Sequence, residues 1–255
     1  MNDEHEPQFE FDGLIGRNSV IEALKAGRTI NKILIAKGDS GGSIKQILAL
    51  ANEKRIVIQF VDRAKLDSMH LNRPHQGVVA MVSVKDYVEI EDILKAAEDK
   101  GEPPLVIILD GINDAGNLGA ILRTADAVGA HGVIIPKRRA VALNFTVSRT
   151  SAGAVEYVPV ARVTNITQAI ETLKKSGLWI AGAAAGEGVE FYKGDYKGPT
   201  AIVIGGEGEG ISRLVLEKCD YIINIPATGS ISSLNASVAC GIIMYEVFRQ
   251  RHQGV

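Results

Sequence analysis

Three polar stretches, each directly after an apolar run, carry the side chains of this chain that could do chemistry. They lie at 114–119, 205–210 and 225–235. Their candidate functional residues, together with an arginine shortly after the first stretch, are Asn117, Arg123, Gly205, Gly206, Glu207, Ile225, Ser233, Leu234 and Asn235. In an open α/β sheet, the turns at the carboxyl ends of strands are where small ligands bind. The three stretches therefore predict one binding site built from three strand ends.

The glycine-rich stretch at 205–210 narrows the choice of ligand. It lacks the Gly-Lys-Ser/Thr ending of a phosphate-binding loop, and it does not fit the Gly-x-Gly-x-x-Gly pattern of dinucleotide-binding folds. Glu207 and Glu209 would repel a pyrophosphate. A ligand with cationic groups suits the turn better, and S-adenosylmethionine is such a ligand. The alternative is that these glycines serve tight packing alone.

Arg123 lies off the apolar face of its expected helix, 117–128. Leu118, Ile121 and Leu122 belong to a stripe at helical spacing, and Arg123 is about 140° around the axis from Leu118, at about 100° per residue. One interpretation is a solvated surface arginine. The other is a guanidinium that binds phosphate or a reacting hydroxyl.

The last expected helix, 234–251, has two unusual properties. Ser233 and Asn235 stand at its start, where Ser and Asn commonly cap helices. Its body is apolar nearly all round the cylinder, and such a helix must be covered on every side. We therefore expect a homodimer that buries it.

The order of the expected elements indicates an α/β protein with a mostly parallel sheet covered on both faces. Beyond residue 104, strands are expected at 105–110, 132–135, 155–160, 178–183, 201–204 and 221–225. Helices are expected at 117–128, 144–152, 166–176, 212–218 and 234–251. Before residue 86, a smaller α/β module is expected, with two helices opened by capping boxes at Ser19 and Ser43.

Charge divides the chain in the same place. Residues 13–85 hold 12 Lys and Arg against 5 Asp and Glu, a net charge of +7, whereas the rest of the chain carries −9. A small basic module indicates a polyanion-binding domain, with RNA or DNA as the partner. We expect an acidic disordered tail at 1–12, the basic module at 13–85, a linker at 86–104 and a second domain at 105–255.

The remaining composition argues against several classes of protein. Two cysteines and five histidines show no metal-ligand spacing, and no run is long enough to span a bilayer. The N-terminus does not resemble a signal peptide, so we expect a cytoplasmic protein without a metal or a membrane partner.

Taken in order, the three stretches resemble the motifs of the SpoU (TrmH-like) RNA 2′-O-methyltransferases. The matching segments are DAGNLGAILRTA at 114–125, IGGEGEGI at 204–211 and IPATGSISSLNAS at 225–237. A fourth segment, HQGVVA at 75–80, is similar to the end of the family's N-terminal module, which resembles ribosomal protein L30e. The chain departs from the usual family pattern at Ala115 and Ala227, where proline and methionine are common.

The resemblance implies a C-terminal α/β methyltransferase domain with a trefoil knot, an L30e-like substrate-binding domain and an obligate homodimer. It implies methyl transfer from S-adenosylmethionine to a ribose 2′-hydroxyl of RNA. The nearest subgroup modifies a guanosine of 23S ribosomal RNA. Among the candidates named above, the implied catalytic residues are Asn117, Arg123, Glu207, Ser233 and Asn235. The implied cofactor contacts are Gly205, Gly206, Ile225, Ser233 and Leu234.

Physical chemistry limits the role of Arg123. Arginine is essentially always protonated, so we expect this residue to bind a phosphate and to stabilise negative charge on the reacting oxygen. Three alternatives remain open: a tRNA 2′-O-methyltransferase, a non-catalytic RNA-binding or ribosome-assembly protein, and an NAD-dependent dehydrogenase.

Overall fold

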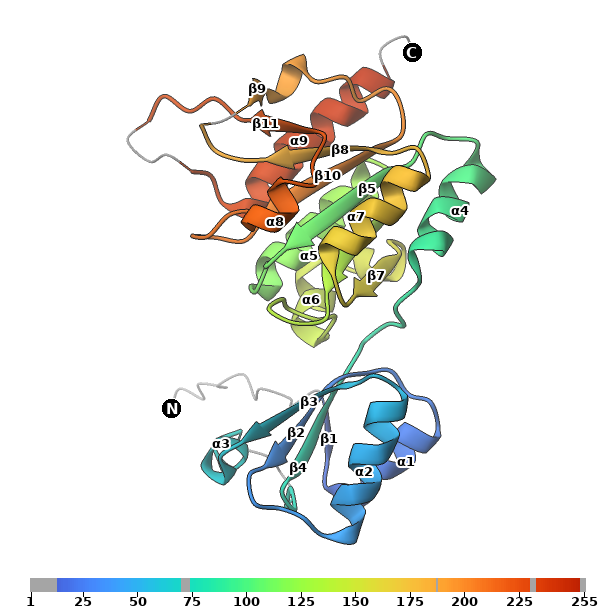
Figure 1. The fold of residues 1–255 in the computed structure, drawn as a ribbon, viewed down its shortest axis with the longest axis vertical. Coiled ribbons are helices and arrows are strands. Elements are labelled where there is room, and N and C mark those ends of the chain that lie inside the picture. The colour runs from blue at the N-terminus through green and yellow to red at the C-terminus, as the bar shows by residue number, and fades with distance from the viewer. Residues whose placement is uncertain (1–12, 70–73, 187, 230–232, 253–255) are drawn as a thin grey trace, which may run out of the picture. The chain divides into compact units, whose positions relative to one another are not determined.

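The computed structural model describes residues 13–69, 74–186, 188–229 and 233–252 and divides the chain into two compact units, Met1–Val84 and Lys85–Val255. Figure 1 shows both units as ribbons, each with its own sheet. Among the described residues, no helix is long and apolar enough to cross a membrane.

The smaller unit is a four-stranded sheet in the order β1-β4-β2-β3, with β2 and β3 parallel and β4 antiparallel to both of its neighbours. Its elements are β1 (Gly13–Ile15), α1 (Arg17–Lys25), β2 (Ile30–Ala36), α2 (Gly42–Glu53), β3 (Val57–Val61), α3 (Arg63–Asp67) and β4 (Val78–Val82). Helices α1 and α2 bury their apolar stripes on one face of this sheet, and Leu66 of α3 packs with Leu34 and Val79 in a separate cluster.

The capping boxes expected in the smaller unit are wrong. Helix α1 begins at Arg17 and helix α2 at Gly42, each after a glycine N-cap without a side-chain hydrogen bond. The Ser43 hydroxyl instead accepts a hydrogen bond from Arg17 Nη1 at 3.2 Å. Gly16 and Gly41 occupy the N-cap positions, so the two helices start three and two residues earlier than N-caps at Ser19 and Ser43 would indicate.

The larger unit is a seven-stranded sheet in the order β7-β6-β5-β10-β8-β11-β9, and every described pairing in it is parallel. The expected α/β class with a mostly parallel sheet is confirmed. Its strands are β5 (Leu105–Asp110), β6 (Gly132–Pro136), β7 (Val160–Val163), β8 (Trp179–Ala183), β9 (Val189–Glu190), β10 (Thr200–Gly205) and β11 (Tyr221–Asn224). Its helices are α4 (Ile90–Lys100), α5 (Ala115–Ala127), α6 (Phe145–Thr150), α7 (Ile166–Lys175), α8 (Arg213–Leu216) and α9 (Ala236–Arg251), with short 3-10 turns at Ala154–Glu156 and Phe191–Lys193.

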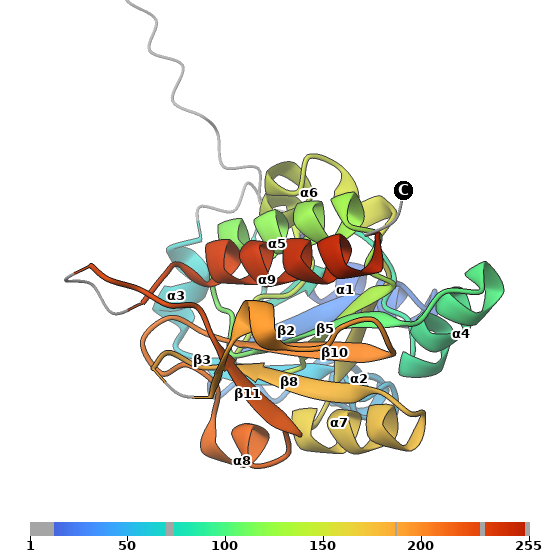
Figure 2. The same cartoon turned by 90° about the horizontal axis from the view of Figure 1, so that it is seen from above.

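The helices divide between the two faces of this sheet. Figure 2 shows α5, α6 and α9 on one side and α7 and α8 on the other. Helices α4, α7 and α8 share a core with alternate residues of the strands, among them Val106, Ile108 and Val203. Because both faces are covered, the strands β5 and β10 are apolar except for Asp110 at the end of β5 and Thr200 at the start of β10.

The segment 86–104 is not the linker expected from the sequence. It contains α4, whose Ile90, Ile93 and Ala97 are buried in the core of the larger unit. Spaced at i, i+3 and i+7, these three residues form a narrow apolar stripe on an otherwise charged helix.

The strand expected at 155–160 is also displaced. A 3-10 turn occupies Ala154–Glu156, and β7 begins only at Val160. The turn is held by the Ser151 hydroxyl, which accepts from the backbone N–H of Val155 at 3.3 Å. Two-residue strand β9 and three-residue strand β1 were too short to give a periodic signal.

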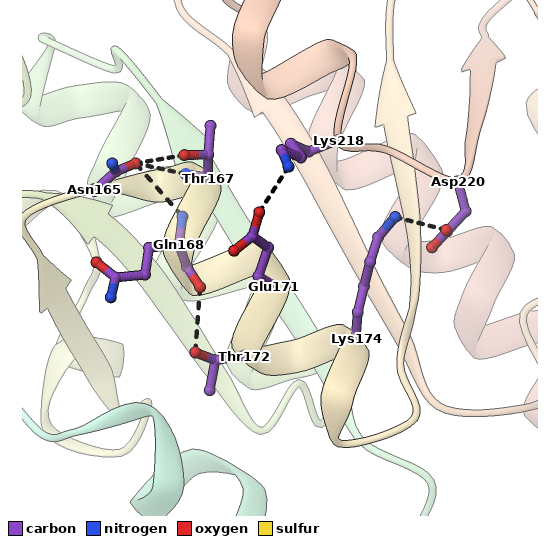
Figure 3. Close-up of polar contacts among 8 residues, drawn as sticks. All are labelled: Asn165, Thr167, Gln168, Glu171, Thr172, Lys174, Lys218 and Asp220. Atoms are coloured by element: carbon purple, nitrogen blue, oxygen red, sulfur yellow. Dashed lines mark hydrogen bonds and ion pairs between the residues drawn. The ribbon is translucent and has the colours of Figure 1, made fainter.

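Polar contacts fix α7 at both of its ends (Figure 3). The Asn165 side chain caps the helix by accepting from the backbone N–H groups of Thr167 and Gln168. Lys174 pairs with Asp220 at 2.7 Å, and Lys218 pairs with Glu171 at 2.6 Å. These contacts join α7 to the segment between α8 and β11.

Candidate functional site

The three polar stretches lie at the carboxyl ends of strands β5, β10 and β11. Strands β5 and β10 are neighbours, with Gly205 in register with Asp110, and β8 separates β10 from β11. The turn after β10 is bonded to the end of β5, since the Gly206 N–H donates to the Asp110 carbonyl at 2.9 Å. The Ser212 N–H donates to Asp110 Oδ2 at 2.8 Å. The sheet topology therefore brings segments about 100 residues apart in sequence to one place.

One residue from each stretch enters a shared hydrogen-bond network, which we call the polar trio: Asn117, Glu207 and Asn235. Asn117 Nδ2 donates to Glu207 Oε1 at 3.0 Å. Asn235 Nδ2 donates to the same oxygen at 2.7 Å and to Asn117 Oδ1 at 2.9 Å. Asn117 is only 8% exposed, whereas Glu207 and Asn235 are exposed. The trio is thus a built polar cluster that opens to solvent on one side.

Helix starts position two members of the trio. Asp114 is the N-cap of α5, and its Oδ1 accepts from the Asn117 backbone N–H at 2.8 Å. Asn235 is the N-cap of α9, where its Oδ1 accepts from the backbone N–H groups of Ser237 and Val238. Its Nδ2 is left to donate into the trio. Capping and site formation are therefore combined in one side chain.

Close backbone contacts explain the first two glycines of the turn after β10. A Cβ on Gly205 would lie 2.0 Å from the carbonyl carbon of Gly210, and one on Gly206 would lie 2.4 Å from the Gly111 carbonyl oxygen. Gly208 and Gly210 have φ of 87° and 67°, in the left-handed region that glycine adopts most easily. Tight packing thus accounts for Gly205 and Gly206, and backbone conformation accounts for Gly208 and Gly210, in the turn that carries Glu207.

Arg123 does not join the trio. It is exposed on α5, about 9 Å further along the helix axis than Asn117 and about 120° around it, at 1.5 Å and 100° per residue. Its side chain has no hydrogen bond or ion pair with any described residue. The guanidinium is therefore available to a ligand or to another chain.

The residues expected to contact the cofactor lie at the end of β10 and in the segment after β11. Ile225 is half-buried just after β11, and Leu234 is 45% exposed. Ser233 is exposed beside Leu234. Residues 230–232 of the third motif lie outside the described residues. The described parts of the two turns after β10 and β11 contain no lysine or arginine. Apolar side chains, carbonyl groups and the Glu207 carboxylate fit a ligand with an aromatic ring and cationic groups.

Two acidic residues of the site were not among the candidate functional residues named from the sequence. Asp110 receives the hydrogen bonds that hold the β10 turn, and Asp114 caps α5. The signal for Asp114 was present, because an aspartate three residues before a helical polar residue is a common N-cap pattern. The role of Asp110 depends on sheet order, which local sequence does not encode.

The two cysteines and His131 lie in surroundings that suit a structural role and not a catalytic one. Burial raises the pKa of the Cys219 thiol to about 11 and that of Cys240 to about 12, so both stay protonated and unreactive near neutral pH. His131 is 2% exposed, and its Nδ1 accepts from the Leu105 backbone N–H at 3.0 Å. Burial lowers the pKa of His131 and favours its neutral form. Within the described ranges, no group of three His, Cys, Asp or Glu side chains is placed to hold a metal ion.

Comparisons with known proteins agree with this arrangement of turns. Residues 104–245 match the model of the SpoU rRNA Methylase family, and residues 14–88 match that of the RNA 2′-O ribose methyltransferase substrate-binding family. A Bacillus subtilis (strain 168) protein assigned to the TrmH family of tRNA/rRNA methyltransferases is 50% identical over 243 residues, which cover 95% of this chain and 97% of that protein. A Staphylococcus haemolyticus relative with the same family name is 49% identical, over 94% of this chain and 96% of its own length.

Solved structures give the same result. The SpoU methyltransferase AviRb from Streptomyces viridochromogenes, in complex with the cofactor AdoMet, superposes with a TM-score of 0.61 at 28% identity, over 95% of this chain and 91% of that chain. An AdoMet-bound rRNA methyltransferase from Sinorhizobium meliloti gives 0.59 at 26% identity, over 92% and 85%. Family models cover both units, and AdoMet-bound relatives share the fold. The chain belongs to the SpoU rRNA methylase family, and it is an S-adenosylmethionine-dependent RNA methyltransferase.

Proposed function

We propose that this enzyme methylates a ribose 2′-hydroxyl of RNA, and that its target is a guanosine of 23S ribosomal RNA. The observation that carries the proposal is the polar trio at three strand ends, with Arg123 exposed on the same helix as Asn117. The match of residues 14–88 to a 2′-O ribose methyltransferase substrate-binding family supports the 2′ position. The smaller unit, with its charge of +7 over 13–85, is the proposed RNA-binding domain.

The turns after β10 and β11 are the proposed cofactor site. Gly205 and Gly206 offer main-chain groups, while Ile225 and Leu234 offer apolar contact to an adenine ring. Ser233 contributes a hydroxyl next to Leu234. The sulfonium of the bound cofactor makes its methyl group electrophilic, so the chain itself needs only to align the ribose and to manage charge.

Arg123 is the proposed catalytic residue for the RNA side of the reaction. A permanently charged guanidinium binds the phosphate next to the target ribose and stabilises negative charge that develops on the 2′-oxygen. The polar trio fixes the turn that carries Glu207 against α5 and α9, so that the ribose meets a preformed surface. Ser233 and Asn235 shape the ribose side of this surface.

A homodimer and a trefoil knot belong to the same proposal. Helix α9 packs against α5, yet its Val238 and Tyr245 are 50% and 53% exposed, one below and one above the half-buried Ile242 on a continuous stripe. An apolar stripe of this kind fits a second copy of the chain. Sedimentation of the protein at micromolar concentration tests this. A stable, active monomer contradicts the homodimer.

The RNA target is tested in cells that lack this protein. Ribose methylation is mapped in their ribosomal and transfer RNA, and we expect one guanosine of 23S RNA to lose its methyl group. Loss at a tRNA site instead would identify a tRNA enzyme, which the names of the relatives also allow. A cytoplasmic location follows from either target. A non-catalytic RNA-binding role would require that millimolar S-adenosylmethionine fails to raise the melting temperature.

A further inference from the structure

The arginines of the larger unit fall into two groups. Four have described partners: Arg213 pairs with Glu217, Arg249 pairs with Glu246, and Arg162 and Arg251 donate to backbone carbonyls. The other four are exposed, and their side chains have no ion pair or hydrogen bond within the described part of the chain; they are Arg123, Arg138, Arg139 and Arg149. All four of these lie on α5, on α6 or on the loop 137–144 between β6 and α6.

The topology carries this loop and α6 to the side of the candidate site. Strand β6 is the neighbour of β5, and the loop 137–144 leaves its carboxyl end. The Val141 N–H donates to the Ile112 carbonyl at 2.8 Å, which bonds the loop to the connection between β5 and α5. On α6, the Thr150 hydroxyl donates to the Ala115 carbonyl at 3.1 Å, in the first turn of α5 that also contains Asn117.

The loop 137–144 and α6 carry charge of one sign. From residue 127 to residue 155 the chain has no Asp or Glu, so Arg138, Arg139 and Arg149 have no acidic neighbour within their own segment. The opposite face of the sheet differs, because Lys174 and Lys218 there are both paired with acids (Figure 3). Unpaired guanidinium groups close to a site for an RNA reaction are typical of phosphate recognition.

An aromatic side chain accompanies these arginines. Phe145 begins α6 and is 54% exposed. It lies four residues before Arg149, so both side chains are on the same face of the helix. Bases of single-stranded RNA stack on exposed aromatic rings in a way that tolerates any sequence. Arginines and a ring together suit an unpaired RNA strand better than a duplex, whose bases are stacked on each other.

We propose that Arg138, Arg139, Arg149 and Phe145, the arginine patch, bind the unpaired RNA strand that flanks the target nucleotide. The three guanidinium groups hold phosphates, and the ring of Phe145 stacks on a base. The patch would thereby present a nucleotide in a loop or bulge to the polar trio. This inference rests on the proposed function, because it assigns the contacts of that same site with its RNA.

Binding of a labelled 20-nucleotide single-stranded RNA, compared with a duplex of equal length, tests the patch in the full-length protein. The double variant Arg138→Ala/Arg139→Ala is expected to bind the single strand about tenfold more weakly at 0.1 M salt. Its slope of log affinity against log salt should fall by about 1.4, because two phosphate contacts each contribute about 0.7 for a single strand. Phe145→Ala should lose about fivefold or more, and Phe145→Tyr should bind nearly normally.

Matched variants separate specific contacts from bulk charge and from misfolding. Lys95→Ala/Lys175→Ala removes two exposed positive charges from α4 and α7 and should change single-strand affinity by less than twofold. Arg139 has φ of 57°, so Arg139→Gly removes the guanidinium at a position where glycine relieves backbone strain. We expect Arg139→Gly to weaken RNA binding without lowering the melting temperature.

Two results would overturn the patch: equal losses in the patch and control variants, or patch variants that bind the single strand as well as the wild type. The proposed function fails separately, if the wild type transfers no methyl group to a ribose of RNA from cells lacking this protein. In methyl transfer to that RNA, the double variant should raise KM for RNA about tenfold with little change in kcat. Its affinity for S-adenosylmethionine should stay unchanged, since the cofactor turns are untouched.

Discussion

The polar trio and the unpaired arginines differ in how far the folded chain alone determines their positions. Asn117, Glu207 and Asn235 hold one another at 2.7–3.0 Å, and two of them are further fixed at helix starts. Arg123, by contrast, is exposed and has no hydrogen bond or ion pair with any described residue. Contacts within the folded chain fix the side chains of the polar trio, whereas the guanidinium of Arg123 would be fixed only by a bound ligand.

This difference corresponds to two functions of the site, cofactor binding and RNA binding. A turn that must fit the same small cofactor in every cycle benefits from a preorganised shape. An RNA strand arrives in many conformations, and long cationic side chains can follow its phosphates before they settle. We therefore expect changes in the trio to affect cofactor binding and changes in the arginines to affect the RNA side.

The largest effect is expected from Arg123→Ala. Loss of charge stabilisation at the reacting oxygen should lower kcat by about a thousandfold, the upper range for removal of one such group. The affinity for S-adenosylmethionine and the melting temperature should hardly change, because the Arg123 side chain is exposed and has no hydrogen bond to the trio. Transfer of labelled methyl groups to RNA measures kcat, and calorimetry measures the cofactor affinity and the melting temperature.

Arg123→Lys tests whether positive charge alone is sufficient at this position. Lysine keeps the charge but loses the planar fork of donors, so this variant should also be severely impaired. Near-normal activity of the lysine variant would mean that charge alone suffices. Full activity of the alanine variant would show that Arg123 is a solvated surface residue without a catalytic role.

The next largest effect concerns the smaller unit. Deleting residues 1–84 removes one compact unit and most of the basic charge over 13–85, so RNA affinity should fall by about ten- to a hundredfold. Cofactor affinity should persist, since every cofactor turn lies in Lys85–Val255. Equal RNA affinity with and without this unit would argue against the division of labour.

A smaller effect is expected from Glu207→Ala. Its Oε1 accepts from both Asn117 and Asn235, and leaving the buried Asn117 amide without this acceptor should cost about 1–3 kcal/mol. Affinity for S-adenosylmethionine should fall about tenfold. Glu209→Ala is the matched control on the same turn, because Glu209 is exposed and is outside the trio. Equal losses in the two variants would show that the turn needs negative charge and no particular hydrogen bonds.

The smallest effect is expected from Gly206→Ala. Its Cβ would approach the Gly111 carbonyl oxygen at 2.4 Å, so the turn must shift, with a loss of about 1–3 kcal/mol in the free energy of unfolding. Gly198→Ala meets nothing within 4 Å and serves as the control. Urea denaturation measures both. An unchanged stability of the Gly206 variant would show that this contact is easily relieved.

Sequence patterns predicted the elements of the larger unit well and the contacts between them poorly. Strand β5 was predicted from an apolar run that follows Gly and Pro residues, and helix α7 from an apolar stripe that follows a capping Asn. Both signals are local in sequence. The capping boxes at Ser19 and Ser43 failed because the preceding glycines started the helices earlier. Residues 86–104 were expected to be a linker, although the amphipathic helix α4 within them packs Ile90, Ile93 and Ala97 into the core of the larger unit.

The candidate site divides in the same manner. The residue types at 117, 207 and 235 were predicted as one site from their positions after apolar runs. Their mutual hydrogen bonds were not, because Asn117 and Asn235 are 118 residues apart and meet only through the order β5-β10-β8-β11. The fold adds that Arg123, on the same helix as Asn117, makes no hydrogen bond to the trio.

The position of the transferred methyl group tests the central claim most directly. The enzyme is incubated with methyl-labelled S-adenosylmethionine and 23S ribosomal RNA from cells that lack it, and the product is then hydrolysed in alkali. A ribose 2′-O-methyl group protects the adjacent phosphodiester, so our account predicts the label in an alkali-resistant dinucleotide that begins with guanosine. Label in mononucleotides would show that a base is methylated and would contradict the proposed reaction.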